Sequence, residues 1–377
     1  MSHILVTNDF PPKRGGIQSY LYDLWNELDP ESFEVVTIAH PGDRDFDAKQ
    51  KFVVHRLEEK MLLPTPKIRK AIEKVARDKE ASLVILDPAL PVGLLGPQLG
   101  IPYGVVLHGA EITVPARLPV VNILLKKVVK EASLVISAGH YALREIKSAL
   151  DCERRDAVVV LPGIDIKRFR PVDEVGKKTA RRLLGLPESG FHIASVSRLV
   201  PRKGMDVLIE ATADLVAEDR DICLVIAGKG RDEKRLKKLA SARNLPVEFL
   251  GEIPEEKLKL LLESSDVFAM LCRNRWFGLE QEGYGIVFNE ASAAGLTSIA
   301  GRSGGSGEAV LDMKTGLVLD RPGDVAVAKQ AIVALMDNED LRLSFAKAAR
   351  RRVETELDTP ILASRLGDAI KKIEQGG

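Results

Sequence analysis

The sequence predicts an α/β fold made of two doubly wound domains, each built around a parallel sheet. The chain has 377 residues, which is long enough for two separate hydrophobic cores. Short runs of aliphatic and β-branched residues alternate with amphipathic helical patterns. This alternation stops at residues 162–171 and then starts again. We therefore expect two Rossmann-like domains that face each other across a cleft, with ligands outside the carboxyl ends of the strands.

The first domain is expected to span residues 1–168. Its buried strands are predicted at 3–7, 33–39, 82–87, 104–108, 133–137 and 157–161. Its helices are predicted at 17–28, 67–78, 118–131 and 141–150. Strands that are apolar on both faces and are separated by helices are typical of a parallel sheet.

The second domain is expected to span residues 169–359. Its strands are predicted at 191–197, 222–227, 247–250, 266–271 and 297–300. Helices are predicted at 205–216, 232–242 and 255–263, and the tail from Val325 onward has only helical patterns, with a break near Pro360.

Composition excludes several classes of function. The net charge is +1 and aromatic residues make up 5% of the chain, which argues against nucleic-acid binding. Three distant cysteines, Cys152, Cys223 and Cys272, give neither a disulfide framework nor the spacing of a metal site. The chain opens directly into a predicted strand and has no apolar run of membrane-spanning length. A cytoplasmic location is therefore expected.

The most informative stretch runs from Glu282 to Glu290, Glu-Gly-Tyr-Gly-Ile-Val-Phe-Asn-Glu. The first acid is expected in a Gly-rich turn and the second on the apolar helix that this turn opens. The two carboxylates are eight positions apart, a little over two helical turns, so we expect both to face the same side. Glycines around the first acid would let backbone N–H groups approach a ligand at a helix N-terminus. An isolated pair of this kind is more often a solvated helix face, but the glycines and the apolar residues 286–288 favour a binding surface.

Two further loops follow predicted strands. Gly15 and Gly16 stand where the first strand gives way to a helix, which suits a phosphate, although a simple tight turn explains them equally well. Arg198 and Lys203 follow the first strand of the second domain, and a guanidinium fork with an ammonium group suits a diphosphate. We expect Arg202, between them, to be solvated. His108 also follows a strand, although a lone histidine is more often structural.

Two basic amphipathic segments, residues 67–79 and 118–130, could rest on an anionic bilayer. An ordinary surface helix is the simpler interpretation of each.

Four ordered motifs together resemble one known family. They are Asn8 to Tyr20, the pair Arg198 and Lys203, Ala227-Gly-Lys-Gly230, and Glu282 to Glu290. They resemble the retaining GT-B glycosyltransferases of family 4, and the likeness covers nearly the whole chain. Within the family, the Asn-Asp-Phe-Pro-Pro opening and the segment 273–281 resemble actinobacterial phosphatidylinositol mannoside mannosyltransferases. The chain departs from the usual pattern at Tyr284, Asn289, Ala294, Thr297 and Ser298.

The resemblance implies transfer of a sugar from a nucleotide diphosphate sugar, with retention and without a metal or other cofactor. The donor would be GDP-mannose, the acceptor a phosphatidylinositol mannoside-type lipid, and the protein a peripheral membrane enzyme. It also implies that a helix from about residue 360 to 377 packs back on the first domain. The catalytic residues implied are His108, Arg198, Lys203 and Glu282; the donor-binding ones are Gly16, Arg198, Lys203, Gly283, Tyr284, Gly285, Ile286 and Glu290; and the acceptor-binding ones are Asp9 and Gln18.

Fixed positive charge from Arg198 and Lys203, with the Gly16 amide, would then stabilise the leaving diphosphate. No Asp-x-Asp motif ends a predicted strand, and Asp43, Asp45 and Asp47 are expected in a solvated loop. Two alternatives remain open: a family 4 enzyme that uses a UDP-sugar with another acceptor, and a nucleotide-sugar binding protein without turnover. The sequence does not decide between a monomer and a dimer.

Overall fold

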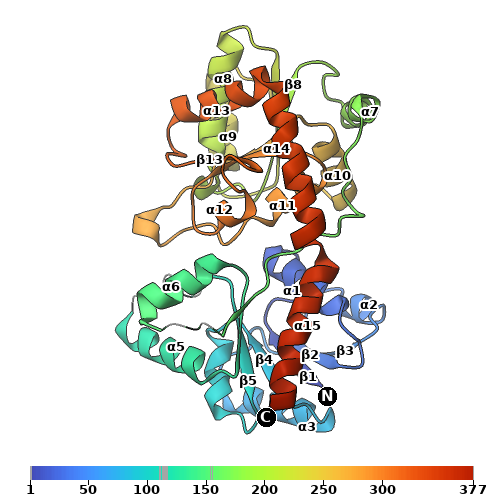
Figure 1. Cartoon of the computed structure of the whole chain (residues 1–377), viewed down its shortest axis with the longest axis vertical. Helices are drawn as coiled ribbons and strands as arrows, with labels where there is room; N and C mark the ends of the chain where they lie inside the picture. Colours follow the sequence, from blue (N-terminus) through green and yellow to red (C-terminus); the bar gives the residue numbers. More distant parts are fainter. Residues whose placement is uncertain (1, 110–111, 113–117, 153, 155, 377) are drawn as a thin grey trace. The chain divides into compact units, whose positions relative to one another are not determined.

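The computed structural model describes residues 2–109, 112, 118–152, 154 and 156–376. The chain divides into two compact units. Unit 1 contains residues 1–163 and 359–377, and unit 2 contains residues 164–358 (Figure 1). The first segment therefore ends after Gly163, earlier than the predicted boundary at 168, and the last helix belongs to unit 1.

Unit 1 is built on a seven-stranded, fully parallel sheet with the order β3-β2-β1-β4-β5-β6-β7. Its strands are β1 (His3–Thr7), β2 (Phe33–Ile38), β3 (Val53–Leu57), β4 (Leu83–Asp87), β5 (Tyr103–Leu107), β6 (Leu134–Ser137) and β7 (Val158–Val159). Its helices are α1 (Gly16–Asn26), α2 (Asp43–Asp47), α3 (Pro66–Asp78), η1 (Val92–Gln98), α5 (Pro119–Glu131), α6 (His140–Leu150) and α15 (Thr359–Gly376).

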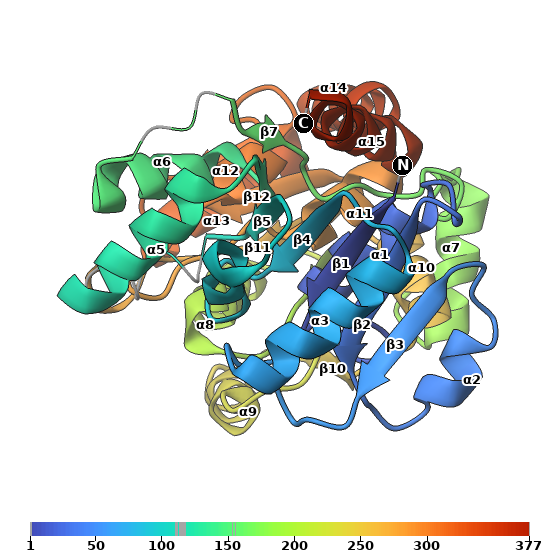
Figure 2. The same cartoon turned by 90° about the horizontal axis from the view of Figure 1, so that it is seen from below.

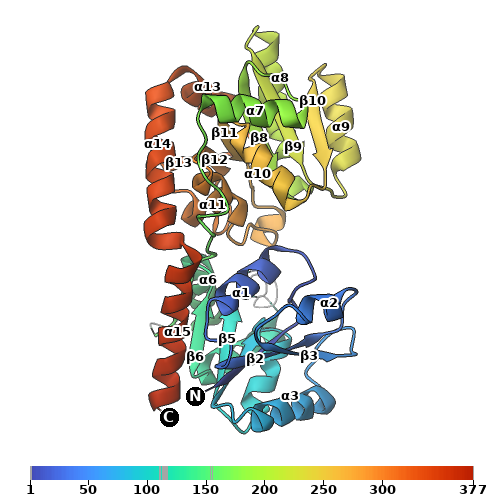
Figure 3. The same cartoon turned by 90° about the vertical axis from the view of Figure 1, so that its right-hand side faces the viewer.

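Alternate residues of the strands pack against different layers of helices. Ile4 and Val6 of β1 belong to a core cluster that also contains residues of α3, η1, α5 and α6. Helix α3 lies against β1 on this face of the sheet (Figure 2). His3 and Leu5 therefore point to the other face of the sheet. On that side α15 lies beside α1 and β6 (Figure 3).

Unit 2 has a six-stranded parallel sheet with the order β10-β9-β8-β11-β12-β13. Its strands are β8 (Phe191–Val196), β9 (Ile222–Ala227), β10 (Val247–Gly251), β11 (Val267–Met270), β12 (Thr297–Gly301) and β13 (Gly316–Leu319). Its helices are α7 (Glu174–Leu184), η3 (Pro201–Lys203), α8 (Met205–Ala217), α9 (Glu233–Ala242), α10 (Glu255–Glu263), η4 (Trp276–Gly278), α11 (Ile286–Ala293), α12 (Ser306–Ala309), α13 (Val325–Asp337), α14 (Glu339–Arg352) and a π-helical turn η5 (Val353–Leu357).

In each sheet, successive strands are added first on one side of a central strand and then on its other side, as in a doubly wound sheet. In unit 1 this strand is β1, which pairs with β2 and β4; in unit 2 it is β8, which pairs with β9 and β11. The loops after these central strands carry Asp9 and Gly16 in unit 1 and Arg198 and Lys203 in unit 2, whereas His108 follows β5 and Glu282 follows β11. The predicted fold class of two Rossmann-like parallel-sheet units is confirmed.

Candidate functional site

The centre of unit 2 holds a buried cluster of two cations and one carboxylate. Lys203 Nζ lies 2.6 Å from Glu282 Oε2, and Arg202 Nη1 lies 2.5 Å from the same oxygen. All three side chains are nearly buried. The prediction that Arg202 is solvated is wrong, because this residue turns inward from η3 to share the carboxylate with Lys203.

Glu282 lies in the Gly-rich turn before the helix that carries Glu290, as expected. Helix α11 begins only at Ile286, so the argument from helical spacing does not apply to Glu282. The loop around Glu282 is held instead by backbone contacts with the Gly304-Gly305 turn. Gly305 N donates to Glu282 O at 3.0 Å, and a Cβ on Gly304, whose φ is +51°, would collide with the same carbonyl.

The charge cluster keeps Glu282 ionised. Burial by itself raises the pKa of Glu282, but the charges of Lys203 and Arg202 and their hydrogen bonds outweigh it and lower that pKa to about 2. The contacts from Arg202, Lys203 and the Cys272 thiol all reach Oε2. Within the described part of the chain, Oε1 has no hydrogen-bond partner. Glu282 can therefore hold a cation with one oxygen and accept from a ligand hydroxyl with the other.

Arg198 has a different environment from Lys203. It follows β8, is exposed, and lines a pocket of about 350 Å³ with Gly228 and Lys229 at the carboxyl ends of β8, β9 and β10. Its guanidinium has no hydrogen-bond or ion-pair partner among the described residues. A cation that no internal carboxylate neutralises is available for an external anion.

The motif after Glu282 forms the start of α11. Gly285 precedes the helix with φ +91°, in the left-handed region that glycine adopts without strain. Gly283 is exposed, and Ile286 and Glu290 are partly buried. The first-turn N–H groups of a helix have no intrahelical acceptor, so this end of α11 can donate to a ligand.

Two departures from the family pattern contact each other. The Tyr284 hydroxyl lies 3.4 Å from the side-chain amide of Asn289, and both side chains are buried. Burial raises the pKa of Tyr284, so its hydroxyl stays protonated and can donate. The Tyr284 hydroxyl and the Asn289 amide are thus buried hydrogen-bonding partners of each other near the start of α11.

In unit 1, His108 is paired with a carboxylate that the sequence analysis did not single out. His108 Nε2 lies 2.6 Å from Asp87 Oδ1, and Thr7 Oγ1 donates to Asp87 Oδ2 at 2.7 Å. Asp87 is fully buried at the end of β4, next to the ends of β1 and β5. The sequence signal that could have identified Asp87 is its position at the end of a predicted buried strand.

The loop after β1 brings the two predicted acceptor residues together. Asp9 Oδ1 accepts from the Gln18 amide and from Lys13 Nζ, the latter at 2.6 Å. Gln18 is buried on α1, whereas Gly16 at the start of that helix is exposed. A Cβ on Gly16 would meet no atom within 4 Å. The start of α1 is therefore open to a ligand.

The acidic segment near residue 45 is not the loop that was expected. Residues Asp43–Asp47 form the short helix α2, and Asp47 Oδ1 lies 2.7 Å from Arg56 Nη2. Across the described residues, no group of three His, Cys, Asp or Glu side chains is arranged to hold a metal ion. The helices described there also include none with the length and hydropathy needed to cross a bilayer.

The segment 273–281, on which the subfamily resemblance depends, is ordered by ion pairs. Arg273 Nη2 lies 2.7 Å from Asp206 Oδ2, and Arg275 Nη1 lies 3.2 Å from Glu280 Oε2. Trp276 and Phe277, at the tip, are exposed.

Family models match both units. The model "Glycosyl transferases group 1" matches residues 176–352, and the model "Glycosyltransferase Family 4" matches residues 14–168. A GDP-mannose-dependent monoacylated α-(1-6)-phosphatidylinositol monomannoside mannosyltransferase of Corynebacterium glutamicum is 36% identical over 98% of this chain and 97% of its own length. The chain belongs to glycosyltransferase family 4. It is an enzyme that transfers glycosyl groups, as predicted.

Other relatives have similar names. GDP-mannose-dependent α-(1-6)-phosphatidylinositol monomannoside mannosyltransferases of Mycolicibacterium smegmatis and Mycobacterium tuberculosis are 37% and 33% identical, over 84% and 98% of this chain and 85% and 97% of theirs. Two solved structures match with a TM-score of 0.81 at 19% identity. They are Anabaena HepE with UDP and glucose, over 99% of this chain and 100% of that one, and the sucrose-phosphate synthase of Thermosynechococcus elongatus, over 100% of both. They support the GT-B fold class for the family 4 transferase.

The roles of individual residues stay predictions. The structure groups Lys203 with Glu282 in unit 2, and Asp9 with Gln18 in unit 1. The division into an acceptor domain and a donor domain is also a prediction.

Proposed function

We propose that this transferase moves an α-mannosyl group from GDP-mannose to a phosphatidylinositol mannoside-type lipid, with retention and without a metal ion. The observation that carries the proposal is the match over nearly the full length of both chains to a relative named for that donor and that class of acceptor. Two further relatives with the same donor in their names cover 84% and 98% of the chain.

Unit 2 has the groups that the donor requires. Arg198 carries a charge that no described side chain neutralises, beside a pocket at the carboxyl ends of the strands, where nucleotides bind in doubly wound sheets. Lys203 supplies a second cation nearby in sequence, held in place by Glu282. Together with the amides at the start of α11, they would stabilise the charge that develops on the leaving diphosphate.

Glu282 is suited to orient the sugar rather than to attack it. Its Oε2 is committed to Lys203 and Arg202, so a single oxygen remains to accept from a donor hydroxyl. We therefore assign retention to transfer on the front face, with a diphosphate oxygen taking the proton from the acceptor hydroxyl as the bond between C1 and the diphosphate breaks. Glu290 would hold the ribose.

In unit 1, His108 would contact the donor sugar, and Asp87 fixes the orientation of its ring. Asp9 and Gln18 would receive the acceptor, and Lys13 helps to hold Asp9 in place through their ion pair. The lipid acceptor implies a peripheral enzyme at the inner membrane face, for which α5 offers exposed Val120 and Ile123 beside basic side chains.

The test is a donor and acceptor panel with the full chain. Radiolabelled GDP-mannose, UDP-glucose and UDP-N-acetylglucosamine are each incubated with a phosphatidylinositol mannoside, with and without EDTA. We expect labelled lipid from GDP-mannose alone, unchanged by EDTA and released by α-mannosidase. Transfer from a UDP-sugar with no use of GDP-mannose would overturn the donor assignment. Loss of activity in EDTA would overturn metal independence.

A further inference from the structure

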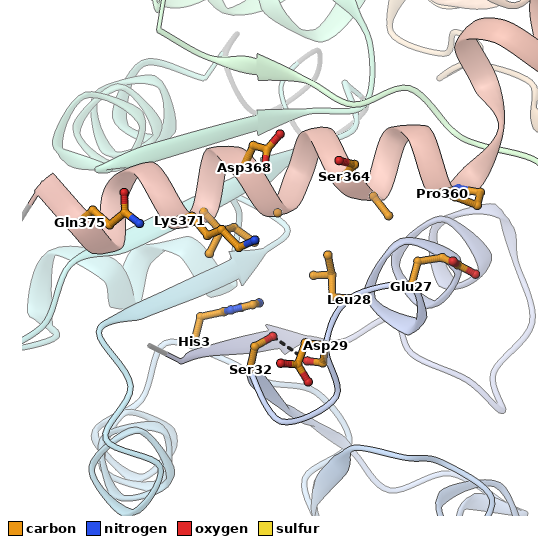
Figure 4. A pocket seen from close by; sticks show the side chains of 13 residues that line it. His3, Glu27, Leu28, Asp29, Ser32, Pro360, Ser364, Asp368, Lys371 and Gln375 are labelled. Carbon is orange, nitrogen blue, oxygen red and sulfur yellow. Dashed lines mark hydrogen bonds between the residues drawn. The ribbon is translucent and has the colours of Figure 1, made fainter.

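Besides the pocket beside Arg198 in unit 2, the structure has a pocket of about 620 Å³ in unit 1, between the turn after α1 and helix α15 (Figure 4). His3 lies at its floor and is the first residue of β1, so the pocket is at the amino end of that strand. His108, Asp9 and Gly16 belong to loops at the carboxyl ends of the strands. The pocket is therefore separate from the candidate transfer site.

His3 presents an unused hydrogen-bond donor to this pocket. Its side chain is 2% exposed, and its Nε2 accepts from Trp25 Nε1–H at 3.0 Å. An indole N–H can only donate, so the imidazole proton must be on Nδ1. Burial lowers the pKa of His3 to about 3, which keeps the ring neutral. Among the described residues Nδ1–H has no acceptor, and it is not one of the fully enclosed unpaired atoms, so it can be reached from the pocket that His3 lines.

The ring of His3 extends from β1 toward the space below α15 (Figure 4). The turn that closes this side is well fixed. His3 N donates to Ser32 O at 3.0 Å, and the Ser32 hydroxyl donates to Asp29 O at 2.6 Å. Leu28 and Ile370 give the pocket an apolar wall. The donor is thus held at the floor of a preformed cavity.

The rim determines what charge a ligand can have. It contains three carboxylates, Glu27, Asp29 and Asp368, and one ammonium group, Lys371. The resulting excess of two negative charges disfavours nucleotides, phosphates and anionic headgroups. A polyamine would satisfy the carboxylates but would leave the His3 N–H without an acceptor.

A neutral sugar satisfies both requirements, because each hydroxyl can accept from His3 and donate to a carboxylate. Its C–H face can contact Leu28 and Ile370, and the cavity volume is in the range of small-ligand sites. We propose that this pocket is a binding site for a neutral sugar, separate from the site of transfer.

Saturation-transfer NMR on the full chain tests the proposal. The probes are methyl α-mannopyranoside, spermidine and inositol 1-phosphate, each in the presence of excess GDP. We expect transfer to the glycoside alone. Ser364→Trp, which fills the pocket from α15, should weaken glycoside binding at least about tenfold. The matched control Lys372→Trp places the same bulk on α15 outside the pocket lining and should leave binding and turnover unchanged.

Further variants make the outcome decisive. His3→Met keeps a weak thioether acceptor for Trp25 but has no N–H donor, so it should also weaken glycoside binding, whereas Lys203→Met in unit 2 should not affect it. If His3→Met does not fold, Asp368→Asn at the exposed rim replaces it. Binding of spermidine or of the phosphate alone, no binding of the glycoside, or glycoside binding that Ser364→Trp leaves intact would overturn the proposal.

Discussion

Lys203 Nζ lies 2.6 Å from Glu282 Oε2, and Arg202 shares that oxygen. Arg202 Nε also lies 3.8 Å from Glu280 Oε1, whereas Glu282 is the one carboxylate paired with Lys203 among the described residues. Removing the anion therefore has a different consequence from removing one cation, because a lone buried charge is costly while a remaining ion pair is not.

We predict that Glu282→Gln destabilises the chain by about 3–5 kcal/mol, because it leaves the buried Lys203 without a carboxylate, while Arg202 keeps only its longer contact of 3.8 Å to Glu280. Lys203→Met should cost less, since Arg202 still pairs with Glu282. Urea unfolding of both variants at pH 7 measures the difference. Equal losses would show that Arg202 does not sustain Glu282 in the absence of Lys203.

The same cluster predicts how stability depends on pH. The pKa of Glu282 falls from 4.5 to about 2 on folding, so the unfolded state binds the proton more tightly. The stabilisation from Glu282 is complete above about pH 4.5 and decreases as the pH falls toward 2. Urea unfolding between pH 3 and pH 7 should show this loss in the parent, and a smaller one in Glu282→Gln. The same slope in both would assign the effect to other carboxylates.

Arg198→Ala should remove about 2–4 kcal/mol of transition-state stabilisation while the thermal midpoint stays unchanged. Its side chain has no described internal partner, so its loss leaves nothing buried and unpaired. The measurement is kcat/KM with GDP-mannose. Lys229→Ala, at an exposed cation of the same pocket, is the matched control and should have a smaller effect. Comparable losses in the two variants would mean that the pocket only needs general positive charge.

The dyad in unit 1 predicts a loss of turnover without a large loss of stability. Asp87→Asn removes the carboxylate that orients His108 at 2.6 Å, and misplacement of a substrate contact can reduce kcat about 100-fold. Thr7→Val removes only the hydrogen bond to the other Asp87 oxygen and is the control. We expect kcat to fall far more in Asp87→Asn than in Thr7→Val. An unchanged kcat in Asp87→Asn would mean that His108 has no role in the transfer reaction.

The comparison of these sites with the sequence shows where local patterns suffice. The predicted central strands were found because they are continuous apolar runs, as in β4 and β5. Strand β3 was missed because it is only partly buried and contains His55 and Arg56. Strand β13 is short and begins at Gly316, which weakens its pattern.

Candidate residues could be chosen from the sequence one loop at a time, but contacts between loops could not be predicted. Position in a loop after a strand made Arg198, Lys203 and His108 candidates. The partners Asp87 and Arg202 were not identified, because each depends on which distant residue the fold brings beside it. Tyr284 and Asn289 were recognised as unusual, but only the structure shows that they contact each other.

The last prediction concerns the membrane, and the structure separates the two basic helices. In α3, Ile68, Ile72 and Ala76 are buried in the core of unit 1, so only the charged side chains of that helix are available to contact a membrane. In α5, Val120 and Ile123 are 71% and 69% exposed. Apolar side chains beside basic ones favour insertion into an anionic interface.

We therefore expect the full chain to sediment with vesicles containing phosphatidylinositol at low salt, and less at high salt because the attraction is screened. Val120→Ser with Lys127→Glu should weaken this binding, since each basic residue near an anionic surface contributes about 1 kcal/mol. Lys74→Glu on α3 makes the same change of charge without loss of an exposed apolar side chain, so it is the matched control and should lose only the charge contribution. Hydrolysis of the donor should be unchanged in all variants. A larger loss of vesicle binding in the α3 variant than in the α5 variant would place the membrane contact on α3. If the parent chain does not sediment with vesicles, neither helix binds the membrane.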